Sequence, residues 1–466
     1  MKKLFLLVLF TSISYNYTFS QLPNQGTILL KKLDTYTSYS ACWGYTAPNG
    51  REYAILGTNV GTSFVDITDS ANIREVDSVK GLNSNWREMK TYGHYAYVVT
   101  EAASTTNAAL NGVQIIDLQY LPDSVRLVKT WNYPGYTKTH SISQSGNYLY
   151  LNGGNSAANG GITVVDVIDP INPVKLGQWT TKYVHDSRIL NDTIWASNVY
   201  TGETSIINAT NKSSLEFVRT WRSYPTSEVS THNCAFSKDN KYLLTTNEIS
   251  SPNGKLNVWN VDDINNITFI REWTPTNITT AIVHNVETFG DFAIIAHYSA
   301  GIRILNIANP MSPIELGWYD TYPTNNNTNF SGCWGVYIFS SGKIIGSDIS
   351  NGLHVIKTTF PITDITNSST GIAEDFRLDQ NYPNPFNPTT TVKFFLKENS
   401  LVNLKVVNLQ GREVADLLND RRDGGNYEVI FDAKNFDLSS GTYFYTLKVQ
   451  NANNSFTQTK KMILVK

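Results

Sequence analysis

The sequence predicts an all-β protein, a seven-bladed β-propeller followed by a small immunoglobulin-like β-sandwich. Three observations support this: the composition, a hairpin that recurs seven times, and a run of short alternating strands at the C-terminal end. Aromatic residues make up 12% of the 466 residues, with 26 Tyr and 10 Trp. No long segment shows the apolar period of a helix, whereas aromatic and β-branched residues in alternation favour strands.

The recurring hairpin is clearest in "STHNCAFSKDNKYLLTTNE" (residues 230–248), where apolar residues alternate on both sides of a polar turn. Consecutive copies begin between 43 residues (Trp43 to Trp86) and 54 residues (Trp86 to His140) apart. A period of ~40–50 residues with several short strands per repeat is typical of propeller blades. The residues that open the seven hairpins, called the first column below, are Trp43, Trp86, His140, His185, His232, His284 and Trp334.

Each hairpin is followed by two more strands, best seen in "GITVVDVIDPINPVKLGQW" and "GIRILNIANPMSPIELGWY". A β-branched strand ends in Asp or Asn, and a turn with Pro leads to a short outer strand, where a missing N–H is tolerated. The seventh repeat lacks its outer strand. The segment "GTILLKKLDTY" (26–36) resembles the outer strands of the other repeats. We therefore predict that it closes the ring of a propeller spanning residues 22–360.

The N-terminus predicts export. Two lysines precede an apolar core from Leu4 to Phe10, and small residues follow up to Ser20, as in a signal peptide of residues 1–20. No other segment is apolar enough to span a bilayer. Charged residues amount to 16%, with a formal net charge of −2, which excludes nucleic acid and anionic membranes as expected partners.

The remaining Cys and His residues are less informative. A secreted chain of this size does not need a disulfide framework, and the odd count of three Cys leaves at least one thiol unpaired within the chain. Cys42 and Cys333 precede Trp residues that align in repeats 1 and 7, which leaves open whether they pair. His94 in a turn and His354 in an outer strand are both expected to be exposed.

After a polar linker (361–375), residues 376–466 form the second predicted domain. The segment "NYPNPFNP" (381–388) is too rich in Pro for a helix. Short alternating strands follow, including "LQGREV" (409–414), "SSGTYFY" (439–445) and the final "KKMILVK". About seven strands in ~90 residues predict a β-sandwich.

The first column is also the candidate functional site, because four of the 7 His residues occupy it in consecutive repeats: His140, His185, His232 and His284. In a propeller the first strand of each blade lines the central channel, and the second strand runs back to the same end. The residues that end the second strands are Asn59, Glu101, Gly154, Asn198, Glu248, His297 and Asp348. Counting back from short turns pairs His284 with His297, His185 with Asn198 and Trp86 with Glu101. We expect all of these at one mouth of the channel.

Two interpretations of this column remain open. In the first, the column holds flat side chains that serve the repeat structurally, as Trp does in three repeats, and Asp186, Asn233 and Asn285 cap their blades. In the second, His140, His185, His232, His284 and His297 with Glu248 bind a metal ion, and Glu248 or Glu101 acts as a ligand or general base. Imidazoles without thiolates suit zinc, copper or iron.

The quoted motifs also resemble known families. The cores "ITVVDVIDP" and "IRILNIANP" resemble the LVIVD repeat, and the whole propeller resembles the choice-of-anchor B family of secreted proteins. The motifs of the C-terminal domain resemble the C-terminal sorting domain of the type IX secretion system, found in Bacteroidetes and relatives. This second resemblance implies passage through that machinery, removal of the domain, and either release or attachment to surface lipopolysaccharide.

The expected function is therefore that of a secreted or cell-surface propeller that binds a ligand or partner at the channel mouth. The alternative is a metal-dependent hydrolase or oxidoreductase that uses the His-rich site at the same mouth. The sequence contains no GxSxG, HExxH or phosphate-binding glycine motif that would decide whether the protein is an enzyme. The ligand, the substrate and the identity of a bound metal are left open.

Overall fold

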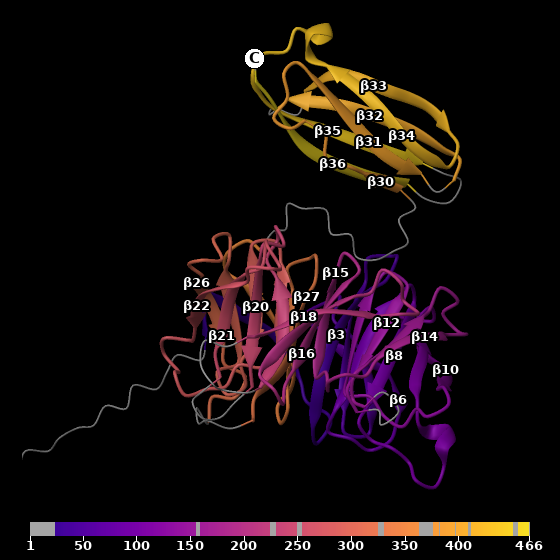
Figure 1. Ribbon diagram of the computed structural model, residues 1–466, viewed down its shortest axis with the longest axis vertical. Helices are drawn as coiled ribbons and strands as arrows, with labels where there is room; N and C mark the ends of the chain where they lie inside the picture. The colour runs from indigo at the N-terminus through magenta and orange to yellow at the C-terminus, as the bar shows by residue number, and fades with distance from the viewer. Residues whose placement is uncertain are drawn as a thin grey trace, which may run out of the picture.

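A computed structural model describes residues 24–154, 159–223, 230–248, 254–324, 330–362 and 376–465, apart from 382, 397, 409–411 and 451–454. The predicted signal peptide and residues 363–375 of the predicted linker lie outside the described residues. Figure 1 shows two bodies of strands, one coloured from indigo to orange and one yellow. Within the described residues there is no α-helix, and the two short 3₁₀ helices are η1 (Ala108–Leu110) and η3 (Ala433–Phe436). The predicted all-β class is confirmed.

The first body consists, in the described part of the chain, of seven antiparallel sheets, called blades 1 to 7 in chain order. Blades 1 to 3 contain β3 (Tyr39–Thr46), β4 (Glu52–Thr58), β5 (Gly61–Asp66) and β6 (Arg74–Lys80); β7 (Arg87–Tyr92), β8 (Tyr95–Thr100), β9 (Val113–Asp117) and β10 (Arg126–Trp131); β11 (Ser141–Ser145), β12 (Tyr148–Asn152), β13 (Ile162–Asp166) and β14 (Val174–Trp179). Blades 4 and 5 contain β15 (Asp186–Leu190), β16 (Thr193–Asn198), β17 (Glu203–Asn208) and β18 (Glu216–Arg222); β19 (Thr231–Phe236), β20 (Tyr242–Asn247), β21 (Leu256–Asn260) and β22 (Thr268–Trp273). Blades 6 and 7 contain β23 (Val286–Phe289), β24 (Phe292–Ala296), β25 (Ile302–Asn306) and β26 (Ile314–Tyr319); β27 (Cys333–Ile338), β28 (Ile344–Asp348), β29 (Gly352–Thr358) and β2 (Thr27–Leu33).

The blades stand in a ring. The first strand of each blade contacts the first strands of the blades on either side, and β27 of blade 7 contacts β3 of blade 1. The second strands are the most buried; every residue of β4, for example, is buried. The residues of the fourth strands, such as β6, are mostly exposed or half-buried. Burial therefore falls from the inner strands to the rim, as expected when blades pack face to face around a channel.

The N-terminal strand completes blade 7. β2 pairs antiparallel with β29, from Thr27 opposite Thr358 to Leu33 opposite Leu353, and the short β1 (Asn24–Gln25) adds to β26 of blade 6. Both pairings cover strand edges that would otherwise present free N–H and C=O groups. Leu30 and Leu33 pack against the core between blades 7 and 1, whereas Leu29 is 37% exposed.

The Asp or Asn that ends the third strand has a local structural role. In blades 1 to 6 its side-chain Oδ1 accepts a hydrogen bond of 2.8–3.0 Å from the backbone N–H two residues later. Such Asx turns redirect the chain out of a strand. The six residues are Asp66, Asp117, Asp166, Asn208, Asn260 and Asn306. The most regular part of the repeat motif therefore shapes the turn to the outer strand and lies away from the channel mouth.

His354 is buried, so the expectation that it is exposed is wrong, whereas the side chain of His94 in its turn is 43% exposed. His354 lies in β29, the third strand of its blade, because β2 forms the outer strand and covers it. Its ring packs 5.7 Å from that of Tyr319. Burial, with the charge of Lys32, lowers the pKa of His354 to about 4.

This burial predicts a loss of stability in weak acid. An unfolded His titrates near pH 6.5, so between pH ~6.5 and about 4 the unfolded chain binds a proton that the folded state excludes. The free energy of unfolding should fall as the pH decreases through this window. We expect His354→Gln to lose less stability than the wild type between pH 7.5 and pH 5, by on the order of 2 kcal/mol. Urea denaturation at both pH values measures this difference, and equal losses in the two proteins would contradict it.

The second body is a sandwich of two sheets. One contains β30 (Phe376–Leu378), β31 (Thr389–Leu396) and β34 (Gly425–Asp432); the other contains β33 (Glu413–Arg422), β32 (Ser400–Asn408), β35 (Gly441–Gln450) and β36 (Ser455–Leu464). Alternate residues of β31 and β32 are buried, as expected for strands with one face on a core. Phe386 of the Pro-rich entry joins that core together with Phe394 and Leu447. These residues form a hydrophobic core of their own.

Candidate functional site

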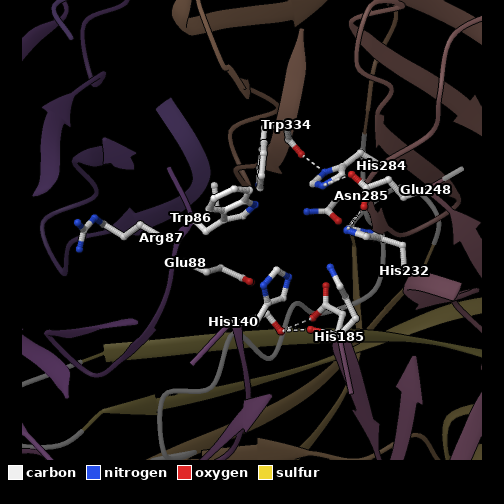
Figure 2. Close-up of a pocket in the computed structure, with 13 residues that line it drawn as sticks. Trp86, Arg87, Glu88, His140, His185, His232, Glu248, His284, Asn285 and Trp334 are labelled. Atoms are coloured by element: carbon white, nitrogen blue, oxygen red, sulfur yellow. Dashed lines mark hydrogen bonds and ion pairs between the residues drawn. The ribbon is translucent and has the colours of Figure 1, made fainter. Parts of the chain in front are cut away.

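The first-column residues form a ring of side chains at one mouth of the channel (Figure 2). Neighbouring ring centroids lie 4.0 Å apart for His140 and His185, 4.1 Å for His185 and His232, and 4.2 Å for His232 and His284. Trp334 follows at 4.9 Å from His284, and Trp86 lies 6.5 Å from Trp334. The structure thus brings the four predicted imidazoles side by side.

Trp43 does not belong to this ring, so its alignment with the first column is wrong. Its indole contacts Tyr337 and Lys90, deeper along the channel, and Ala41 takes the place at the mouth in blade 1. An irregularity in the pairing of β3 with β4, between Tyr39 and Cys42, shifts the register. The shared letters "CWG" in blades 1 and 7 therefore mark different levels. All three Cys residues are buried free thiols.

Glu248, which follows β20, lies beside two of the imidazoles. Its Oε2 is 3.5 Å from His232 Nε2, and its Oε1 is 3.7 Å from His284 Nε2. The hydroxyl of Tyr298 donates a hydrogen bond to Oε1. One ligand atom from each of His185, His232 and Glu248 lies within 4.8 Å of the other two. Ligands ~2.0–2.2 Å from one zinc ion lie at most about 4.4 Å apart, so small side-chain rotations would let these three groups share one metal ion.

His140 is held by a different carboxylate. Its Nδ1 lies 2.8 Å from Oε1 of Glu101, the residue that follows β8. Burial opposes protonation of His140, but Glu101, with smaller contributions from Glu88 and Asp186, outweighs it and raises the pKa of His140. The hydrogen bond from His140 in turn lowers the pKa of Glu101. Both residues line or border the mouth, but they form an ion pair of their own.

His297 is not brought to the mouth, and its expected place beside His284 needs correction. The last regular pair of β23 and β24 is Val286 with Ile295. Beyond it, His284 N–H bonds the carbonyl of Ala296, while His297 N–H bonds the carbonyl of Gly301 in a turn. The ring of His297 packs near Trp273, fully buried. A simple count back from the turn missed this irregularity.

The other three imidazoles of the ring are neutral. Burial, reinforced by repulsion from neighbouring imidazoles, lowers the pKa of His232 and of His284 to about 3 and that of His185 well below its ordinary value. His284 Nδ1–H donates to the carbonyl of Trp334. In the described structure, Nδ1 of His185 and of His232 makes no hydrogen bond of good geometry. A backbone group of the next blade, at His232 and at His284 respectively, nevertheless lies against each imidazole and opposes the lowering of its pKa. A neutral imidazole with a free nitrogen is the form that ligates metals.

A polar layer lies directly beneath the imidazoles. Asp186 accepts hydrogen bonds from Ser141 Oγ and, at 2.6 Å, from Asn233 Nδ2. Asn233 Oδ1 accepts one from the N–H of Val286. These bonds link blades 3 to 6 in series, so Asp186 and Asn233 connect neighbouring blades. Asn285, the next member, has no hydrogen-bond partner for its buried Oδ1 among the described residues.

Two further features of the channel were not anticipated. The Glu88 carboxylate points into the cavity in Figure 2, and burial raises its pKa to about 7. Its place two residues after Trp86 in one strand is a signal that the period of two could have revealed. Deeper in the channel, Arg188 of blade 4 donates to both carboxylate oxygens of Glu287 in blade 6 at 3.1 Å. This pair reaches between non-adjacent blades within the channel.

The cavity bounded by the imidazoles is small, with a volume of about 40 Å³. That space holds only a few water-sized groups. An ion with one or two waters fits, whereas an organic molecule would have to remain largely outside and place only one group within. The geometry therefore defines a propeller with a nitrogen- and oxygen-lined ion-sized cavity at its mouth.

Family models match at both the repeats and the tail. The LVIVD repeat matches residues 136–181 and 282–321, and the secretion system C-terminal sorting domain matches residues 380–466. The chain is thus an all-β repeat protein of the propeller type with an export tail. It is an LVIVD-repeat protein that ends in a type IX sorting domain. The tail assigns it to export through the type IX machinery, to the cell surface or extracellular space.

Solved structures support the fold. A hypothetical selenium-binding protein from Sulfolobus tokodaii has 11% identity and a TM-score of 0.50, covering 86% of this chain and 94% of that chain. Sqt1 from Chaetomium thermophilum has 8% identity and a TM-score of 0.50, covering 71% and 99%. At sequence identities this low, the similarity supports a shared fold and says nothing about a shared function.

Curated proteins gave no match. Within the described residues, no helix has the length and apolar character needed to cross a membrane.

Proposed function

We propose that the exported propeller binds one transition-metal ion at its channel mouth through His185, His232 and Glu248. The observation that carries this proposal is the approach of their three ligand atoms to within 4.8 Å of one another beside an ion-sized cavity. Two imidazoles and a carboxylate are a ligand set known for zinc, copper and iron. The resemblance to the choice-of-anchor B family implies no particular reaction, so it neither supports nor opposes metal binding.

The unpaired nitrogens favour a metal over a purely structural role. In the layer below, Asp186 and Asn233 pair their side-chain oxygens. Nδ1 of His185 and of His232 makes no hydrogen bond of good geometry, and only a backbone group of the next blade lies against each ring. A buried polar atom without a hydrogen bond costs ~1–3 kcal/mol. If these imidazoles served only for packing, an apolar side chain of similar size would fill the same space without this cost. A bound metal would either be ligated by this nitrogen or hold the ring in place through its other nitrogen.

A second candidate function is a metal-dependent hydrolase or oxidoreductase at the same mouth. Three protein ligands would leave a further coordination position open for water or substrate. Glu88 would then be the candidate general base. The Glu88 carboxyl faces the cavity and accepts a hydrogen bond from Lys90 Nζ at 3.2 Å. Burial outweighs the charge of Lys90 and raises the pKa of Glu88 to about 7, so that Glu88 could exchange a proton near neutral pH. Glu248 is better suited to be a ligand, and Glu101 is held by His140, which makes both less suitable as the base.

Elemental analysis tests the proposal directly. Full-length protein purified without an affinity tag should contain close to one equivalent of zinc, copper or iron per chain. Treatment with a chelator should remove it, and titration with the same metal should restore it. Protein that contains no metal after purification and takes up none on titration would contradict the proposal.

Maturation at both ends follows from the export signals. We propose that the signal peptide and the sorting domain are removed, and that the propeller is then released or attached to surface lipopolysaccharide. Mass spectrometry of protein from the native host should show a start near Gln21 and loss of residues beyond about 370. An added mass of a heterogeneous glycolipid at the new C-terminus would indicate attachment. An intact 466-residue chain inside the cell would exclude this route.

A further inference from the structure

A second hollow opens beside the imidazole cavity and shares Trp86 with it. Its volume is about 480 Å³, within the ~300–1,000 Å³ usual for small-molecule sites. The side chains that matter here are Asn59, Asn83, Ser84, Asn85, Trp86 and Glu101. Asn59 lies in the turn between β4 and β5, residues 83–86 lie in the connection of blade 1 to blade 2, and Glu101 follows β8.

The lining of this groove is polar and carries no cationic side chain. Three amides offer both donors and acceptors, and the Oδ1 of Asn59 is buried without a partner in the described residues. The one carboxylate, Glu101, is already bonded to His140. A phosphate or carboxylate ligand would find no positive charge here. A neutral ligand rich in hydroxyl groups would find partners for them.

Trp86 supplies an apolar face in the middle of these amides. Its indole is 43% exposed, although it is fixed at its backbone: Ser84 Oγ donates to the Trp86 carbonyl at 2.9 Å and accepts from the Trp86 N–H at 3.1 Å. Trp334 flanks it on the cavity side. A rigid, half-exposed indole beside hydrogen-bonding groups suits a ligand that is apolar on one face and polar at its edges.

We propose that this groove binds a saccharide, with one sugar ring stacked on Trp86 and its hydroxyl groups bonded to Asn59, Asn83 and Asn85. A pyranose ring has this combination of a C–H face and a hydroxyl-bearing edge. The proposal goes beyond metal binding and does not require it. Glu101 borders the groove and bonds His140 of the cavity wall, so a bound sugar would lie next to the proposed metal site.

Calorimetry with soluble hexasaccharides tests the proposal on the full chain. The probes are the β-1,4-linked glucose, N-acetylglucosamine and xylose hexamers and the α-1,4-linked glucose hexamer, each titrated up to 10 mM. At least one should bind, with or without chelator, and Trp86→Ala should weaken that binding at least tenfold. Tyr120→Ala is the matched control, because Tyr120 is also 43% exposed but lies outside the groove; it should bind like the wild type.

A second variant keeps the proposal testable if Trp86→Ala does not fold. The double variant Asn83→Ala/Asn85→Ala changes two exposed amides and should weaken saccharide binding while its melting curve stays that of the wild type. The proposal is overturned if none of the four hexamers binds, or if binding survives both the Trp86 and the Asn substitutions. If the wild-type protein holds no metal but still binds a saccharide, only the metal proposal is overturned.

Discussion

Deleting Asn24–Leu33 should destabilise the propeller by ~3–5 kcal/mol, because blade 7 loses its outer strand. The deletion exposes the apolar surface that Leu30 and Leu33 cover between blades 7 and 1, and burial of such side chains contributes ~1.5–3 kcal/mol each when complete. It also leaves β29 as an open edge, which favours aggregation. Thermal and urea denaturation measure the first effect, and light scattering the second.

Two point variants separate the role of this strand from a general effect of truncation. Leu30→Asp places a charge against the core, whereas Leu29→Asp places it on the 37% exposed face of the same strand. Only Leu30→Asp should lower the melting temperature substantially. Equal melting temperatures for the wild type and the deletion variant would mean that the N-terminal strand does not close the ring in solution.

His232→Ala should abolish stoichiometric metal binding. Loss of groups that only support a ligand costs ~10–100-fold in metal affinity, so loss of a ligand should cost at least about 100-fold. The metal-free variant should be as stable as metal-free wild type, because the substitution removes a buried imidazole with an unpaired Nδ1. His94→Ala is the control, since His94 is exposed in a turn away from the mouth.

A purely structural column predicts the opposite for the same variant. The metal content would be zero before and after the substitution, and the melting temperature would fall because the rings of His185 and His284, each about 4 Å away, would lose their neighbour. Metal titration followed by calorimetry, combined with a melting curve of each protein, measures both quantities. The two interpretations therefore differ in both measurements.

Much of the fold could be predicted from the sequence because each blade repeats the same local chemistry. The Asx turn after the third strand needs Asp or Asn at one position, and this is visible as "VVDV" and "ILNI". The strand "TILLKKL" could be assigned to blade 7 because it was the one outer strand of the repeat pattern without a blade of its own. The column of imidazoles followed from the same alignment, since equivalent positions in equivalent strands meet around one axis.

The errors have a common physical cause, which is local irregularity in the sheets. Shifts of register in β3 and near His284 moved Trp43 and His297 away from the places that regular pairing predicts. Glu88 and Tyr298 were missed because neither stands out in type or spacing until the blades are closed around the channel. Tyr298 reaches Glu248 from the neighbouring blade, a contact that no single repeat contains.

Anomalous X-ray diffraction from crystals of the tag-free protein is the most direct test of a metal at the channel mouth. Data collected above and below the absorption edge of the metal found by elemental analysis should give one strong peak per chain between His185, His232 and Glu248. Each ligand atom should lie ~2.0–2.2 Å from it if the metal is zinc. A structure of metal-soaked crystals without a peak at this position, or with the imidazoles of His185 and His232 turned away from Glu248, would contradict the metal site.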